Sequence, residues 1–180
     1  FHMIEHINPI DFTDCQRLFH GRGHAYENLS HVNVDWLSPV MLITLYEPVD
    51  ELWLLTQAKA LQALTDKCRS VQVQRRYEKF APTQLLLGET VDRTIVTENG
   101  LSYHIELGKA QNSGLFLDMA NGRSWVYQQA AGKNVLNLFA YTCAFSVAAT
   151  AGGASKVVNI DLSKSSLSKG RENHQLNKLA

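Results

Sequence analysis

The side chains best placed to do chemistry follow two apolar runs in the last third of the sequence. VLNLF (135–139) leads into a loop over 140–144, and VVNI (157–160) leads into Asp161. Both runs predict buried parallel strands, and parallel sheets bind ligands beyond the carboxyl ends of their strands. Asp161 follows the loop by about 20 residues, the spacing at which a carboxylate accepts hydrogen bonds from both hydroxyls of a ribose. The pattern predicts a site for a ribose-containing cofactor.

The loop lacks the glycines that hold a pyrophosphate. NLFAYTCA (137–144) contains none, whereas dinucleotide-binding folds use GxGxxG so that the pyrophosphate can approach the backbone. S-adenosylmethionine has no phosphate and needs a less close approach. The loop therefore favours S-adenosylmethionine over NAD(P). A plain βαβ unit, in which Asp161 makes only local hydrogen bonds, stays open as an alternative.

The sequence changes character near Gly108–Gln111, where we expect a domain boundary. After it, residues 109–180 predict the start of a Rossmann-like α/β domain, because apolar strands separated by a helix indicate a parallel sheet buried on both faces. The expected elements are helices over 118–131, 145–151 and from a Ser163 cap to 178, with strands over 135–139 and 157–160.

Residues 4–108 predict an α+β domain. Asn99-Gly100 lies between alternating runs over 93–107, which predicts a β-hairpin with a type I′ turn. Residues 1–3 are interpreted as a cloning remnant before a start at Met3. The other expected elements are a helix over 9–20, strands over 32–46 broken at Ser38-Pro39, a helix over 49–68 with Leu52, Leu55, Ala58, Leu61 and Leu64 on one stripe, and a strand over 70–76.

The composition is that of an ordinary soluble globular protein, with 45% hydrophobic and 19% charged residues. Basic and acidic residues balance at 17 each, so the overall charge predicts no polyanion partner. The 3 cysteines form no CxxC pair, which favours a cytoplasmic, reducing compartment. No apolar run is long enough for a membrane span. The spacing of His20, His24 and His31 across glycines argues against a metal site.

Three blocks of sequence, in order, resemble the class I S-adenosylmethionine-dependent methyltransferases that modify large-subunit ribosomal RNA, of the cytosine-5 and guanine-N7 type. The blocks are NSGLFLDMANGR from residue 112, VLNLFAYTCAFSVAATAGGASKVVNIDLS from residue 135 and RENHQLNKL from residue 171. The resemblance implies S-adenosyl-L-methionine as the cofactor, ribosomal RNA as the substrate and a seven-stranded sheet.

The resemblance also implies a set of cofactor-binding residues. Asp161 would hold the ribose, and Leu162 would flank the adenine. The remaining residues would be Asn137, Phe139, Tyr141, Thr142 and Cys143 in the loop, Ser146 at the helix N-terminus, and Asp118 and Arg123 beside the cofactor.

Two departures from the family pattern stand out. The family usually has glycine where this chain has Cys143, and arginine where it has Ala120. Glycine permits a positive φ, which cysteine tolerates less well, so we expect a lower cofactor affinity. These departures favour one alternative, a non-catalytic RNA- or protein-binding module built on a degenerate methyltransferase fold. A second alternative, an NAD(P)-linked enzyme, is opposed by the glycine-free loop.

The family's catalytic Asn/Asp-Pro-Pro strand would lie beyond Ala180. We therefore expect the N-terminal portion of a longer enzyme, inactive by itself, with no catalytic residue among these 180. A two-strand fragment would leave an apolar sheet edge open to self-association. A basic cluster near Tyr77 and Phe80 is interpreted as a solvated face in preference to an RNA-backbone patch. Its members are Lys67, Arg69, Arg75, Arg76 and Lys79.

Overall fold

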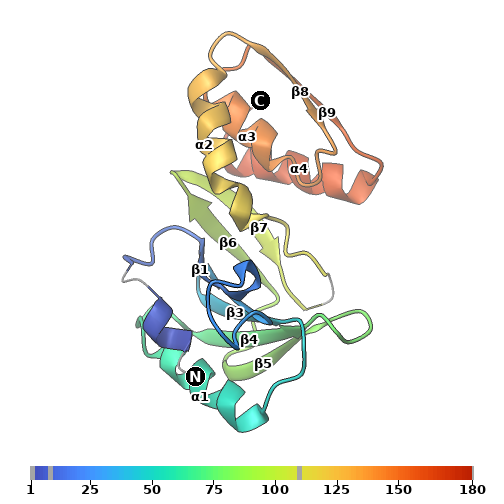
Figure 1. The fold of residues 1–180 in the computed structure, drawn as a ribbon. Helices are drawn as coiled ribbons and strands as arrows, with labels where there is room; N and C mark the ends of the chain where they lie inside the picture. The colour runs from blue at the N-terminus through green and yellow to red at the C-terminus, as the bar shows by residue number, and fades with distance from the viewer. Residues whose placement is uncertain (1–2, 8–9, 109–110, 180) are drawn as a thin grey trace. The chain divides into compact units, whose positions relative to one another are not determined.

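The structure is a computed structural model that describes residues 3–7, 10–108 and 111–179 (Figure 1). It divides into two compact units. Unit 1 comprises residues 1–94 and 106–113, and unit 2 comprises 95–105 and 114–180. Residues 95–105, most of the predicted hairpin, thus group with the second unit. The first two residues of the proposed cloning remnant, and residues 109–110 of the predicted boundary, lie outside the described residues.

The described part of unit 1 contains a five-stranded sheet in the order β1-β2-β3-β4-β5. Neighbouring strands are antiparallel except for β3 and β4, which are parallel. A parallel pair needs a crossover connection, and helix α1 (Glu51–Gln62) supplies it, capped by the Asp50 carboxylate, which accepts a 2.8 Å hydrogen bond from the Trp53 N–H. The strands are β1 (Gln16–His20), β2 (Val32–Leu37), β3 (Val40–Leu45), β4 (Ser70–Arg75) and β5 (Thr83–Gly88).

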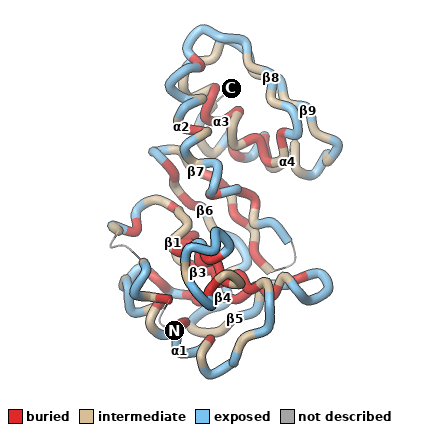
Figure 2. The backbone as a smooth tube through the Cα atoms, viewed as in Figure 1, coloured by how far each residue is buried: buried red, intermediate tan, exposed pale blue. Residues whose placement is uncertain are grey.

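The hydrophobic core of unit 1 lies between this sheet and α1. Trp36, Ile43 and Val73 from the central strands are fully buried against Leu54 and Leu61 of the helix. Figure 2 shows the buried residues concentrated along the central strands. The predicted strands over 32–46 and 70–76 are confirmed, including the break at Ser38-Pro39.

Two sequence predictions in unit 1 are wrong. The helix expected over 9–20 is absent from residues 10–20, and residues 16–20 form strand β1, because pairing with β2 outweighs local propensity. On α1, Leu52 is 73% exposed, whereas Leu54, Ala58 and Leu61 are buried. Steps of three residues drift around a helix, and the buried face follows i, i+4 and i+7.

The predicted β-hairpin is confirmed. Strands β6 (Arg93–Glu98) and β7 (Leu101–Glu106) form a two-stranded sheet in the described part of the chain. Asn99 and Gly100 between them have φ angles of 50° and 77°, as a type I′ turn requires.

The rest of unit 2 is the predicted βαβ start of a Rossmann-like sheet. Strands β8 (Asn134–Leu138) and β9 (Lys156–Ile160) are parallel and in register from Asn134↔Lys156 to Leu138↔Ile160. Helix α3 (Ala144–Ala151) connects them, and α4 (Lys164–Leu176) follows, with Ser163 as its N-cap as predicted. Before them come a short 3-10 helix (Leu117–Met119) and α2 (Ala120–Gln129).

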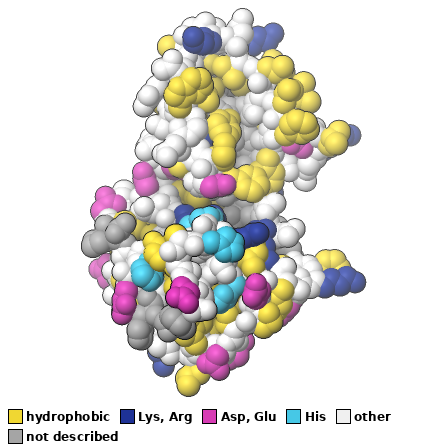
Figure 3. Space-filling view, in the orientation of Figure 1, with side chains coloured by type: hydrophobic (Ala, Val, Ile, Leu, Met, Phe, Trp, Pro, Cys, Tyr) yellow, Lys and Arg dark blue, Asp and Glu magenta, His cyan; other side chains and the backbone are white. Residues whose placement is uncertain are grey.

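One face of the β8–β9 sheet is exposed in the described structure, contrary to the expectation of strands buried on both faces. Leu136, Leu138, Val158 and Ile160 are between 40% and 59% exposed, and Figure 3 shows hydrophobic side chains gathered over these strands. Helix α3 packs on these strands. Among the described residues, no helix combines the length and apolarity needed to cross a bilayer.

Candidate cofactor site

The loop that joins β8 to α3 has an alternating backbone conformation. Phe139, Tyr141 and Cys143 have φ angles of 54°, 48° and 61°. Such left-handed residues cost of order 1–3 kcal/mol each and gather at ligand sites, where the surroundings hold them in place. Two backbone hydrogen bonds help to hold this loop, from Ala140 N–H to the Ile160 carbonyl at 3.1 Å and from Cys143 N–H to the Ala140 carbonyl at 2.8 Å. The chain thus forms the turn without glycine.

Asp161 fastens this loop to the end of β9. One carboxylate oxygen accepts a 2.8 Å hydrogen bond from the Tyr141 N–H, and the other accepts one of 2.8 Å from the Ser163 N–H. These bonds from Ser163 and Tyr141 hold the pKa of Asp161 below its usual value. Each oxygen of an ionised carboxylate has a second lone pair. Asp161 can therefore support the loop and still accept hydroxyl groups from a ligand.

A cavity of about 250 Å³ lies beside the loop. Its wall combines the loop with the segment that precedes α2, and it is mainly apolar. Of the predicted site residues, it includes Asn137, Phe139, Tyr141, Thr142 and Arg123. Phe116 from the preceding segment packs near Tyr141, with ring centroids 5.4 Å apart and ring planes tilted by 48°. The structure thus brings two of the three family-like blocks to one cavity.

Two predicted residues, Asn137 and Ser146, form a polar network under the loop. Asn137 Nδ2 donates to Ser146 Oγ at 2.8 Å and to Asn159 Oδ1 at 3.1 Å, and Ser146 Oγ also donates to Asn159. Ser146 is fully buried, so it supports β8, β9 and α3 from inside and does not face solvent. Sequence reasoning did not identify Asn159, although it lies on β9 only two residues before Asp161.

Arg123 is paired inside unit 2. Its guanidinium makes two 2.7 Å hydrogen bonds with the Glu98 carboxylate, one to each oxygen, and both residues are buried. Its charge is therefore already neutralised by the hairpin. Glu98 was not identified from the sequence, since nothing in the spacing of residues 98 and 123 signals their contact.

Phe139 and Leu162 carry exposed apolar side chains next to Asp161 in the fold. They are 90% and 101% exposed, and each follows the end of one of two strands that are paired in register. Both side chains therefore project from the same edge of the sheet. Asp118, in the 3-10 helix before α2, is exposed and outside the lining of the cavity.

Cys143 is buried, and its backbone adopts the left-handed conformation usually taken by glycine. Burial, together with the negative charge of Asp161, raises the pKa of the thiol to about 11, an effect that the Arg171 guanidinium partly offsets. The thiol is thus protonated at neutral pH and is no nucleophile there. Cys143 is outside the lining of the 250 Å³ cavity.

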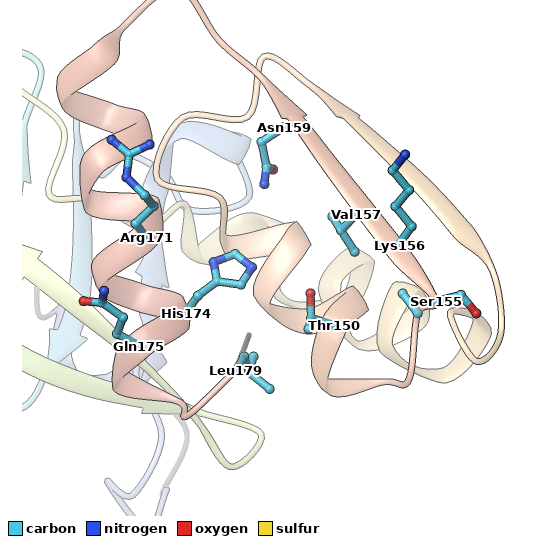
Figure 4. Close-up of a pocket in the computed structure, with 10 residues that line it drawn as sticks. Thr150, Ser155, Lys156, Val157, Asn159, Arg171, His174, Gln175 and Leu179 are labelled. Atoms are coloured by element: carbon cyan, nitrogen blue, oxygen red, sulfur yellow. The ribbon is translucent and has the colours of Figure 1, made fainter.

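A second cavity, of about 590 Å³, lies between α3, β9 and α4 (Figure 4). Its charged and titratable lining residues are Lys156, Arg171 and His174. None of the residues predicted to bind the cofactor lines it. We therefore assign the candidate site to the smaller cavity and the carboxyl ends of β8 and β9.

The basic cluster of unit 1, interpreted from the sequence as a solvated face, is so only in part: Lys67, Arg69 and Lys79 are exposed, whereas Arg75 is buried. Arg75 is buried and contacts Glu51 at 2.9 Å, and Arg76 donates to the Gln111 carbonyl at 2.7 Å. Arg69 pairs with Glu89 at 3.7 Å, and Lys67 donates to the Asp11 carbonyl at 3.2 Å.

In the described ranges, no group of three or more His, Cys, Asp or Glu residues could hold a metal ion.

Comparison with known proteins agrees with a cofactor site at the carboxyl ends of β8 and β9. The sequence model of a family described as S-adenosylmethionine-dependent methyltransferase matches residues 16–180. The chain is 36% identical over 129 residues to ribosomal RNA large subunit methyltransferase K of Neisseria meningitidis, covering 71% of this chain and 36% of the relative. It is 31% identical over 173 residues to the putative ribosomal RNA large subunit methyltransferase YwbD of Bacillus subtilis, covering 93% and 43%.

Solved structures of methyltransferases also resemble this chain. A putative SAM-dependent methyltransferase from Streptococcus mutans superposes with a TM-score of 0.81 at 29% identity, over 95% of this chain and 44% of that one. SMU.776, a putative methyltransferase complexed with SAH, gives a TM-score of 0.82 at the same identity and coverage. The chain belongs to the S-adenosylmethionine-dependent methyltransferase family. It spans less than half the length of these relatives.

Proposed function

We propose that this chain binds S-adenosylmethionine at the carboxyl ends of β8 and β9, and that the protein methylates large-subunit ribosomal RNA. The observation that carries the proposal is the ionised Asp161 carboxylate, which lies at the end of β9 and holds the Tyr141 N–H of the loop. The names of the relatives support the RNA substrate, and the SAH complex of a structural neighbour supports the cofactor.

The residues at this edge suit such a cofactor. Asp161 would accept hydrogen bonds from the ribose hydroxyls with its remaining lone pairs. Leu162 and Phe139 would give the adenine an apolar contact, since both are almost fully exposed at the strand ends. The loop without glycine offers no cradle for a pyrophosphate. When bound, the cofactor supplies a methyl group on a sulfonium, which a base nitrogen or carbon accepts by in-line displacement.

Calorimetry of the chain with S-adenosylhomocysteine and with NAD tests the cofactor assignment. We expect the homocysteine compound to bind and NAD not to bind, and Asp161→Ala to weaken binding by at least about tenfold, the scale of a lost charged hydrogen bond. Glu172→Gln is the control, because Glu172 is an exposed carboxylate on α4. Binding of neither compound would instead favour a non-catalytic module on a degenerate fold.

The substrate assignment needs the longer protein. We expect it to transfer a tritiated methyl group to large-subunit ribosomal RNA that lacks the modification, and to leave the modified RNA unlabelled. The cytoplasm is the proposed location, which suits the free, buried thiols of Cys68 and Cys143. Labelling of small-subunit RNA or of protein alone would contradict the substrate assignment.

We also propose that the chain self-associates through the exposed apolar face of β8 and β9. Contiguous apolar surface of this kind marks interaction sites or aggregation-prone surfaces. Analytical ultracentrifugation would show a concentration-dependent increase in mass, which Leu138→Lys together with Ile160→Lys would suppress. A monomer at all concentrations would exclude the proposal.

A further inference from the structure

One face of α4 meets both the cofactor loop and the hairpin of unit 2. Gly170, Asn173 and Asn177 lie at i, i+3 and i+7, so they share one stripe of the helix. Asn173 is fully buried. Asn173 and Asn177 belong to the third family-like block, to which the candidate site assigns no role.

Asn173 bridges the loop and the hairpin through a single side chain. Its Nδ2 donates to the Thr142 carbonyl at 3.1 Å, and its Oδ1 accepts a hydrogen bond from the His104 N–H at 2.9 Å. Thr142 also anchors the loop from its side chain, since its Oγ1 donates to the Gly114 carbonyl at 2.6 Å. The loop is thus tied at Thr142 to two segments that lie far from it in the sequence.

Asn177 makes a similar contact with the hairpin but not with the loop. It accepts from the Ser102 N–H at 2.8 Å and donates to the Ser102 carbonyl at 2.7 Å. The two asparagines together satisfy backbone groups of β7, as a neighbouring strand would. Asn173 makes one hydrogen bond with the hairpin and Asn177 makes two, and of these two residues only Asn173 also holds Thr142. Asn177 therefore serves as the control for the loss of a hairpin contact without the loss of the loop contact.

We propose that Asn173 is a positioning residue for the cofactor loop, an inference that rests on the proposed function. The Thr142 carbonyl lies between Tyr141 and Cys143, both in the left-handed conformation. Without a bound donor at this carbonyl, the two residues relax toward ordinary φ angles, and the Tyr141 N–H leaves Asp161. Asn173 thereby sets the loop backbone that the cofactor meets, without contacting the cofactor itself.

The first experiment compares Asn173→Ala with Asn177→Ala in the same chain. We expect the affinity for S-adenosylhomocysteine to fall about tenfold in Asn173→Ala, the scale of one buried hydrogen bond, and less than about twofold in Asn177→Ala. Urea denaturation measures how far each variant is destabilised, so that affinities are compared where both are folded. Equal losses of affinity in the two variants would overturn the proposal.

The second experiment uses Asn173→Asp, which removes the donor and keeps an acceptor for the His104 N–H. Burial raises the pKa of the introduced carboxyl, and its protonated form can donate to the Thr142 carbonyl again. The affinity of this variant should therefore rise as the pH falls from about 8 to 5, with a smaller change in the wild type and Asn177→Ala. A purely structural role would give no such recovery, and a pH-independent Asn173→Asp would contradict the proposal.

Amide hydrogen exchange separates this inference from the proposed function. If the wild-type chain binds no S-adenosylhomocysteine, the proposed function fails. The loop can still be followed through the Tyr141 and Cys143 amides. These amides should exchange faster in Asn173→Ala than in Asn177→Ala, because the first variant alone frees the Thr142 carbonyl. Equal exchange in both variants would overturn the positioning role, whatever the cofactor result.

Discussion

The side chain of Cys143 packs against Gly170, so closely that a β-carbon on residue 170 would lie 2.3 Å from the Cys143 sulfur. The family resemblance described above implies a glycine at position 143. In this chain the sulfur occupies space that a glycine on α4 leaves open. The departure at Cys143 is thus accommodated by the helix opposite and does not reach the cavity beside the loop.

This contact predicts that the effect of Gly170→Ala on the free energy of unfolding depends on residue 143, and that it has opposite signs with cysteine and with glycine there. Gly170→Ala should destabilise the wild-type chain by about 1–3 kcal/mol, because the added methyl overlaps the thiol. In a Cys143→Gly background it should stabilise by up to about 1 kcal/mol, since alanine favours a helix over glycine. Urea denaturation of the wild type, the two single variants and the double variant gives the coupling free energy between residues 143 and 170. Additive effects would show that the two residues do not interact.

Cofactor affinity should be nearly insensitive to Cys143→Gly. The thiol faces α4, and the backbone of Cys143 already has the φ of 61° that glycine would supply. We expect the affinity for S-adenosylhomocysteine to change less than about threefold, below the scale of a lost hydrogen bond. A larger gain, measured by calorimetry, would restore the sequence-based view that cysteine impairs the loop.

Breaking the Arg123–Glu98 pair should destabilise unit 2 strongly. Each residue is buried and bound to the other by two hydrogen bonds of 2.7 Å, so Arg123→Ala leaves an uncompensated carboxylate at a cost of about 3–5 kcal/mol. Replacing both, as Arg123→Met with Glu98→Leu, should restore most of that loss. Chemical denaturation measures both effects. A mild loss in Arg123→Ala, combined with weaker cofactor binding, would point instead to a direct contact with the cofactor.

The loop should stay fastened to β9 down to acidic pH. The pKa of Asp161 is lowered in the folded chain from its ordinary 3.8, so its contribution to stability is present above that value. The contribution is lost only as the pH falls through the lower, folded pKa. In ¹³C NMR the Asp161 carboxyl should titrate below 3.8, and the Tyr141 amide shift should follow it. A midpoint above 3.8 would show that the hydrogen bonds from Tyr141 and Ser163 are not kept in solution.

Local sequence patterns were sufficient for several elements. Asn99-Gly100 fixed the hairpin turn through its positive φ angles. The apolar runs before the loop and before Asp161 indicated two parallel strands, and Ser163 indicated the start of α4. These features depend on residues within a few positions of one another, so they can be read from the chain directly. The glycine-free loop and the spacing to Asp161 likewise indicated the cofactor class.

Other features depended on contacts between distant segments. Residues 16–20 form a strand only because β2 offers a partner edge, and the buried face of α1 is set by the sheet beneath it. Arg123 meets Glu98, Cys143 meets Gly170, and Asn173 joins Thr142 to His104. The sequence by itself determined the βαβ unit and the position of its acidic residue. Only the tertiary structure decided which side chains support the loop, because burial and hydrogen-bond geometry arise when α4 and the hairpin pack around it.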